Sequence, residues 1–415
     1  MQIFHNIYSN VRRLILKKNQ IYFSSFAYAI AIILNFSFTL AIINFRGMDD
    51  FSKFLVDFSI VSFLVSFIQG NQQNRLNFIR SNKTILASVE YYFYFIKLFF
   101  FISIVVVLSA ILTEQSVLSI TFFALSFGLI KSISFFTRLR NIILGSCDIL
   151  IIYLTALISL KLFPDLSAFE CLTFSALFSF LVQIAYNTSS VMNLASIVSR
   201  KKNLNYKRLL STNTWRPQII LGVNALLGNS TRLLDLWILS ILGFGEIASG
   251  LRIIKQFAEI PNIIKGLPSS LIISTSFYKQ NHNSSSFKLF LKECSPINLI
   301  AAFVSACLIF FLLSDLFETL YGINLQGSKL LILSFVFYTY LQVYGPVRLF
   351  YSINGREMVI LKVQIIATVF YFVSLIVLAV FLKIHNLELF VSNKIWFDSL
   401  VISALILLIP YPKKK

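Results

Sequence analysis

Apolar residues run along the chain in stretches of about twenty, each long enough to cross the hydrocarbon core of a bilayer as an α-helix. The stretches in the first half are Ile21–Asn44, Phe51–Gln69, Tyr91–Leu112, Val117–Phe136, Ser146–Phe163 and Cys171–Ser196. Those in the second half are Gln218–Leu242, Glu246–Phe277, Ser295–Leu313, Leu330–Ile353, Met358–Leu382 and Ile395–Ile409. The pattern predicts an all-α integral membrane protein of about twelve transmembrane helices.

The polar connections between these stretches alternate in charge. Lys and Arg gather at the N-terminus, in every second connection and in the tail Lys413, Lys414 and Lys415. The other connections are poor in basic residues and hold Asp49, Asp50, Glu114, Asp165, Asp315 and Glu318. Because Lys and Arg favour the cytoplasmic side of a membrane, the alternation predicts that both termini are cytoplasmic.

The same pattern divides the chain into five parts. Residues 1–20 have Ile3, Ile7, Val11 and Ile15 at helical spacing among basic residues, which predicts an amphipathic segment at the membrane interface. Residues 21–198 form a predicted N-terminal bundle, and residues 217–410 form a C-terminal bundle. A basic cytoplasmic linker, 199–216, joins them, and a basic tail, 411–415, follows. Two halves of about six spans each are a common plan for transporters.

Composition and motifs limit the classes of function that are possible. The chain has 415 residues, of which 57% are hydrophobic, and a net charge of +19 that membrane topology explains without nucleic acid. Its four cysteines lack metal-site spacing, and no phosphate-binding loop, HExxH or GxSxG motif occurs. The sequence therefore predicts a transporter rather than an enzyme, with no catalytic residues, metal or cofactor.

Charged residues at membrane depth are the most informative chemistry. The seventh and eighth stretches form a predicted hairpin about Gly243–Gly245, so residues equally far from the turn lie at similar depth. The hairpin carries Arg232, Asp235, Arg252, Lys255 and Glu259. The last three share one helix face. Such groups persist in membranes mainly where they pair or line a wet cavity.

Two interpretations follow. The charges could pair with one another, as Arg232 with Asp235 and Lys255 with Glu259, and hold helices together. Alternatively, they line a central cavity with an excess of positive charge. We favour this second interpretation, because a neutralised helix pair would need fewer charges. Arg348 and the mid-span Asp57 are further candidates for this cavity. A cationic cavity suits an anionic cargo, since the planar guanidinium of Arg binds phosphate well.

Three segments resemble the polysaccharide exporters and O-antigen flippases (Wzx type) of the multidrug/oligosaccharidyl-lipid/polysaccharide superfamily, which is MATE-like. They are QGNQQNRLNFIR (Gln69–Arg80), TRLLDLWILSILGFGEIASGLRIIKQFAEIP (Thr231–Pro261) and LYGINLQGSKLLILSFVFYTYLQVYGPVRLFYSINGRE (Leu320–Glu357). The resemblance implies two bundles that face each other in a V. It also implies a multi-pass flippase of the bacterial inner membrane that moves undecaprenyl-pyrophosphate-linked oligosaccharide by alternating access.

On this resemblance, anionic groups of the cargo would contact Arg232, Arg252, Lys255 and Arg348. Charge balance or coupling to protons or sodium would fall to Asp57, Asp235 and Glu259. A polysaccharide polymerase and a chain-length regulator would be its partners.

Two alternatives stay open. A cation-coupled multidrug antiporter of the same superfamily should have an acidic cavity. A membrane-bound polysaccharide polymerase or transferase, which belongs to a different class, should carry a large periplasmic loop.

Overall fold

The computed structural model describes residues 2–81, 85–140, 144, 147–199, 212–257, 357–382 and 386–408, with 303, 304, 307, 311, 347 and 351. These residues form helices, with no strand among them. The helices are α1 (Gln2–Ser81), α2 (Ile85–Leu112), α3 (Val117–Arg140), α5 (Asp148–Leu162), α6 (Ala168–Ser199), α7 (Thr212–Asn229), α8 (Asp235–Ile241), α9 (Gly245–Phe257), α16 (Glu357–Ile376) and α17 (Leu387–Leu407). Two π-helical turns, Ser230–Leu234 and Val377–Phe381, continue α7 and α16.

Helix α1 contains the first two predicted spans and reverses direction between them. The reversal lies at Gly47, whose φ of 85° and ψ of 173° are not helical. Only glycine adopts such a backbone without steric cost. Arg46, beside the reversal, donates a hydrogen bond of 3.0 Å to the carbonyl of Phe163 at the end of α5. The helix begins at Gln2, so the predicted interfacial segment continues directly into the first span.

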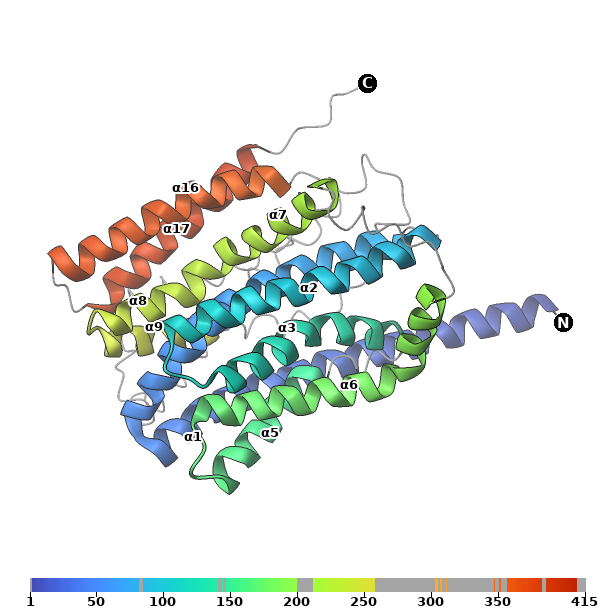
Figure 1. The fold of residues 1–415 in the computed structure, drawn as a ribbon, viewed down its shortest axis with the longest axis horizontal. Coiled ribbons are helices and arrows are strands. Elements are labelled where there is room, and N and C mark those ends of the chain that lie inside the picture. Colours follow the sequence, from blue (N-terminus) through green and yellow to red (C-terminus); the bar gives the residue numbers. More distant parts are fainter. Residues whose placement is uncertain are drawn as a thin grey trace.

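The reversal of α1 lies at the same end of the molecule as the α2–α3, α5–α6 and α8–α9 connections, at the left of Figure 1. We call this the outer end, because the Lys and Arg pattern predicts that it faces away from the cytoplasm. Serine side chains cap two helices there. The amide of Ser119 donates to Oγ of Ser116, while Ser167 and Glu170 bond each other's backbone amides in a capping box.

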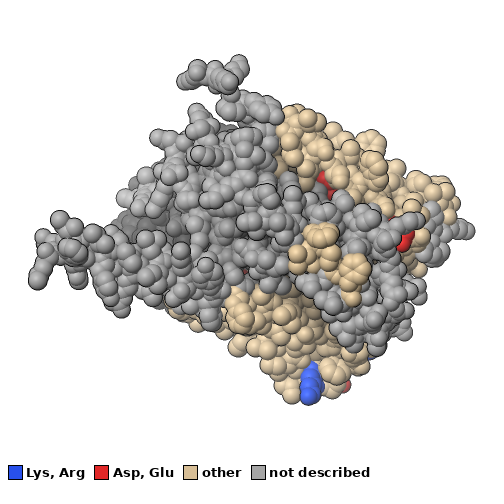
Figure 2. All heavy atoms as spheres, turned by 180° about the vertical axis from the view of Figure 1, so that it is seen from behind, with Lys and Arg blue, Asp and Glu red and all other residues tan. Residues whose placement is uncertain are grey.

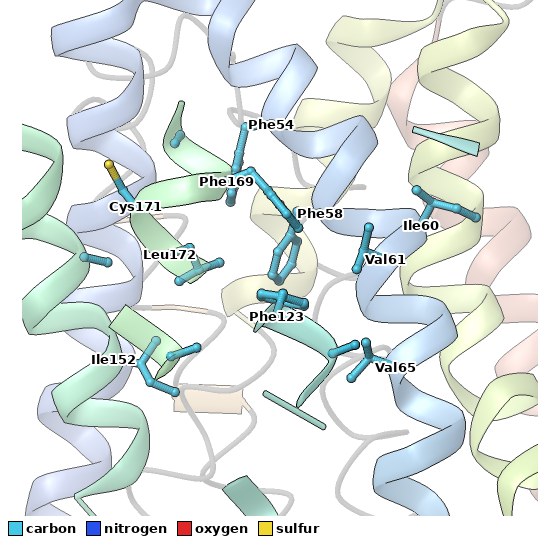
Figure 3. Close-up of a cluster of buried hydrophobic side chains, with 14 of the residues drawn as sticks. Phe54, Phe58, Ile60, Val61, Val65, Phe123, Ile152, Phe169, Cys171 and Leu172 are labelled. Atoms are coloured by element: carbon cyan, nitrogen blue, oxygen red, sulfur yellow. The ribbon is translucent and has the colours of Figure 1, made fainter. Parts of the chain in front are cut away.

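The first hydrophobic core joins α1, α2, α3, α5 and α6. Figure 3 shows Phe54, Phe58, Phe123 and Phe169 at its centre, where aromatic rings from three helices meet. The rings of Phe54 and Phe58 stack with centroids 5.3 Å apart, and Phe58 meets Phe123 edge to face at 6.3 Å. Such pairs add about 0.5–1.5 kcal/mol each beyond the area they bury.

The second core joins α8, α9, α16 and α17. The two cores interlock rather than merely touch. Phe36, Leu40 and Ile43 of α1 pack against the second core, and Leu233, Leu234 and Trp237 pack against the first. The contact between the two cores is therefore made by the first arm of α1 and by the seventh predicted span.

The exposed surface around the helices is strongly apolar. Large side chains such as Phe99, Ile111, Phe370 and Phe381 are more than half exposed, and the described part of the face in Figure 2 shows very few charged atoms. Five helices among the described residues are long and apolar enough to cross a membrane. Exposed apolar area on this scale marks a membrane interface, so the chain is a multi-pass membrane protein.

The last helix differs from its prediction. It was expected over Ile395–Ile409, but α17 begins eight residues earlier, at Leu387, where Asn386 caps it by accepting from the amide of Glu388 at 2.8 Å. Hydropathy placed the start too late because Lys394 interrupts the apolar run. Most residues of the predicted spans 295–313, 330–353 and 246–277, and most of the linker 199–216, lie outside the described residues.

A close approach of α1 and α7 offers a test of packing. A Cβ atom on Gly222 would lie 2.5 Å from the ring of Phe67, and that ring is held edge to face by Phe101 at 4.9 Å. We expect Gly222→Val to lower the free energy of unfolding by about 1–3 kcal/mol, as overpacking does. Unfolding in denaturing detergent would measure the loss. Phe67→Ala should cost less stability in the Gly222→Val background than in the unmodified chain, because it removes the clash, and strictly additive losses would contradict this contact.

Candidate functional site

The hairpin of α8 and α9 brings two predicted residues into direct contact. Lys255 of α9 forms an ion pair with Oδ2 of Asp235 in α8, and the side chains are only 7% and 0% exposed. The hydroxyl of Tyr371 in α16 donates to the same oxygen at 2.7 Å, and the amide of Leu236 donates to Oδ1 at 2.9 Å. The Asp235 carboxylate is thus fully hydrogen-bonded, as a buried charge must be.

The ion pair also stabilises an unusual backbone. Residues 230–234 form a π-helical turn, in which the amide of Asp235 bonds to the carbonyl of Ser230, five residues earlier. Lys255 Nζ donates to two carbonyls of that turn, those of Thr231 at 3.1 Å and Arg232 at 3.4 Å. The three protons of the ammonium therefore match three acceptors. Side chains that bond helix carbonyls in this way accompany distorted helices.

A second buried ion pair lies beside the first. Lys394 and Asp398 of α17 are one helical turn apart, and their side chains are 4% and 5% exposed. Nζ of Lys394 also lies 5.7 Å from the ring centroid of Tyr371, within cation–π range. Tyr371 therefore links the two pairs, and together they join α8, α9, α16 and α17.

Arg252 lies where the second group of helices meets the first. Its guanidinium lies over the ring of Phe58 in α1, with Cζ 5.3 Å from the ring centroid. Phe58 in turn stacks on Phe54. The guanidinium of Arg252 therefore lies where the two groups of helices meet.

A cavity of about 640 Å³ opens at the outer end, between α1, the α2–α3 connection, the start of α6 and the end of α8. We call it the outer pocket. Its polar lining includes Asp50, Lys53, Asp57, Glu114, Gln115 and Trp237. Asp57 is 9% exposed and accepts a 2.8 Å hydrogen bond from Nε2 of Gln115. With three carboxylates and one ammonium, the lining is acidic.

The seven site residues predicted from the sequence do not form one common site among the described residues. Asp235 and Lys255 bond each other, a pairing that differs from the two pairs considered above. Arg252 lies against Phe58, and Asp57 lines the outer pocket. The side chain of Arg232 is exposed, and only its carbonyl contacts Lys255. Glu259 and Arg348 lie outside the described residues.

Sequence reasoning missed three parts of these sites. Lys394 and Asp398 have i, i+4 spacing within an apolar run, which is a usable signal for a buried pair. Tyr371 and Gln115 gave no signal, because their partners are distant in the chain. Trp237 lies in the predicted hairpin, and its Nε1 is buried without a hydrogen-bond partner.

The fold is that of MATE transporters. A point mutant of the Vibrio cholerae MATE transporter VcmN aligns with a TM-score of 0.58 at 13% identity, over 96% of each chain. VcmN in its bent form aligns with a TM-score of 0.51 at 13% identity, over 94% of this chain and 96% of that one. The eukaryotic MATE transporter AtDTX14 aligns with a TM-score of 0.50 at 11% identity, over 95% and 94%. No protein-family model and no curated protein sequence matches the chain.

Proposed function

We propose that this chain, with its MATE fold, is a transporter that moves a lipid-linked oligosaccharide across the bacterial inner membrane by alternating access. The observation that carries the proposal is the position of Arg252. It is half-buried, it belongs to α9, and it contacts α1 of the other bundle through Phe58. A pyrophosphate that passes between the bundles would meet this guanidinium.

The other predicted cations have different roles on this proposal. Lys255 is engaged by Asp235 and two carbonyls, so it holds the hairpin instead of the cargo. Arg348 stays a predicted second contact for the pyrophosphate. Translocated repeat units would pass to a polysaccharide polymerase and a chain-length regulator.

The test uses cells that make a surface glycan through this protein. Arg252→Ala should slow export about tenfold or more and cause lipid-linked oligosaccharide to accumulate, because a hydrogen bond to a charged group contributes about 1.5–3 kcal/mol. Arg252→Lys keeps the charge but not the two-pronged geometry, so its effect should be smaller.

The matched control is Lys362→Ala, which removes an exposed cation from α16. It should leave export unchanged. Normal glycan and no accumulated intermediate in the Arg252→Ala strain, with the variant protein present at normal level, would count against an oligosaccharide cargo.

A second candidate function is favoured by the outer pocket. An excess of carboxylates beside Phe54 and Trp237 suits an organic cation, as expected for a multidrug antiporter. A strain without the protein would then become sensitive to lipophilic cations, with its surface glycan unchanged.

A further inference from the structure

The outer pocket has the size and position of a binding site. Its volume of about 640 Å³ is typical of sites for small molecules. The first bundle contributes most of its wall, while Trp237 and Ile241 come from α8. A group that emerges between the bundles at the outer end would therefore reach this pocket first.

The lining combines the two kinds of group that a sugar requires. A sugar ring has an apolar face and a rim of hydroxyls. The ring of Trp237 offers aromatic surface, and Asp57 and Gln115 offer hydrogen-bonding groups.

Charge decides which sugar fits. Asp50, Asp57 and Glu114 face a single ammonium, that of Lys53. Asp57 is 9% exposed, so water screens its charge poorly. A carboxylate on the cargo would be repelled there, whereas a protonated amine would be attracted. This differs from the cationic cavity that the sequence predicts for acidic sugars.

We propose that the outer pocket binds the sugar part of the cargo and selects repeat units that carry protonated amino sugars over repeat units that carry acidic sugars. The inference rests on the proposed function and names its substrate class. The pyrophosphate and the sugars would thus contact different places, the first near Arg252 and the second beyond the ring of Phe54.

The experiment measures binding of soluble trimers to the full chain in lipid nanodiscs at slightly acidic pH. The probes are trimers of glucosamine, N-acetylglucosamine and galacturonic acid. In a Trp215→Phe/Trp396→Phe background, Trp237 is the remaining tryptophan of the three in the chain, and its fluorescence reports on the pocket. Thermophoresis of the unmodified chain gives the same affinities without relying on that background.

We expect the glucosamine trimer to bind about tenfold more tightly than the galacturonic acid trimer, with the difference shrinking at high salt. Asp57→Asn/Glu114→Gln should abolish the preference. The matched control, Asp165→Asn, removes an exposed carboxylate from the same end but outside the pocket, and should leave the preference intact.

Equal binding of the acidic and amino trimers would overturn the selectivity and leave the proposed function standing. Quenching by tetraphenylphosphonium, with no response to any sugar, would overturn both. The two proposals can also fail separately. If the Arg252→Ala strain accumulates no lipid-linked intermediate but the purified chain still prefers the amino sugar, the proposal of a lipid-linked cargo is wrong and the selectivity of the outer pocket is supported.

Discussion

Replacing Lys255 with methionine is expected to lower the free energy of unfolding by about 3–5 kcal/mol, because it leaves the buried Asp235 carboxylate without its counter-charge. The substitution also deprives the carbonyls of Thr231 and Arg232 of their side-chain donor. Equilibrium unfolding in mixed micelles with denaturing detergent would measure the change.

A control variant and a double variant test whether the buried charge causes this loss of stability. Lys362→Met removes an exposed lysine from α16 and should change stability little. Asp235→Asn/Lys255→Met should recover part of the loss, since the amide oxygen still accepts from Tyr371 and no buried charge remains. The two carbonyls still lack their side-chain donor, so recovery should be incomplete. A Lys255→Met protein as stable as the Lys362→Met control would contradict the buried pair.

Breaking the second pair should cost as much but be easier to rescue. Lys394→Met leaves Asp398 buried and uncompensated, for an expected loss of about 3–5 kcal/mol in the same unfolding measurement. Lys394→Met/Asp398→Leu replaces a pair within one helix by apolar groups of similar size. Such replacements are often neutral or stabilising, so the double variant should return to the stability of the unmodified chain or exceed it.

Comparing the two double variants distinguishes an ion pair within one helix from an ion pair that joins two helices. Lys394 and Asp398 share α17, whereas Asp235 and Lys255 join α8 to α9 and to the π-helical turn. If Lys394→Met/Asp398→Leu remains as unstable as Lys394→Met alone, the pair has an essential role beyond charge balance. Its unpartnered Oδ2 atom of Asp398 would then be the first place to look.

Much of the fold could be predicted from the sequence, because helices in a membrane are marked by long apolar runs and short polar connections. The α8–α9 hairpin and the matched depth of Asp235 with α9 followed from counting residues outward from Gly243. Equal distance from the turn puts Asp235 about level with Arg252, whereas in the structure it bonds Lys255, less than one turn further along α9. The π-helical turn is one reason, because rise and rotation per residue differ there from the α-helical values.

The sites were harder to predict, and for a different reason. The outer pocket forms from four separate segments, and no periodicity in the sequence indicates which connections meet. Asp57 was recognised from its depth alone, but Gln115, its partner, is 58 residues away. Lys394 was excluded because it ends the polar stretch Ser392–Lys394 that precedes the predicted span, whereas a charge with a partner one turn along the helix can be buried.

The π-helical turn at residues 230–234 has a mechanical consequence. A helix that gains or loses one residue from a turn changes its phase by about 100°. If this turn tightened to an α-helix, α7 would rotate relative to α8, and Gly222 would move away from Phe67 of the other bundle. Lys255 holds the wider turn in place through two carbonyls. The ammonium group of Lys255 therefore helps to fix the angular relation between the two ends of the seventh span.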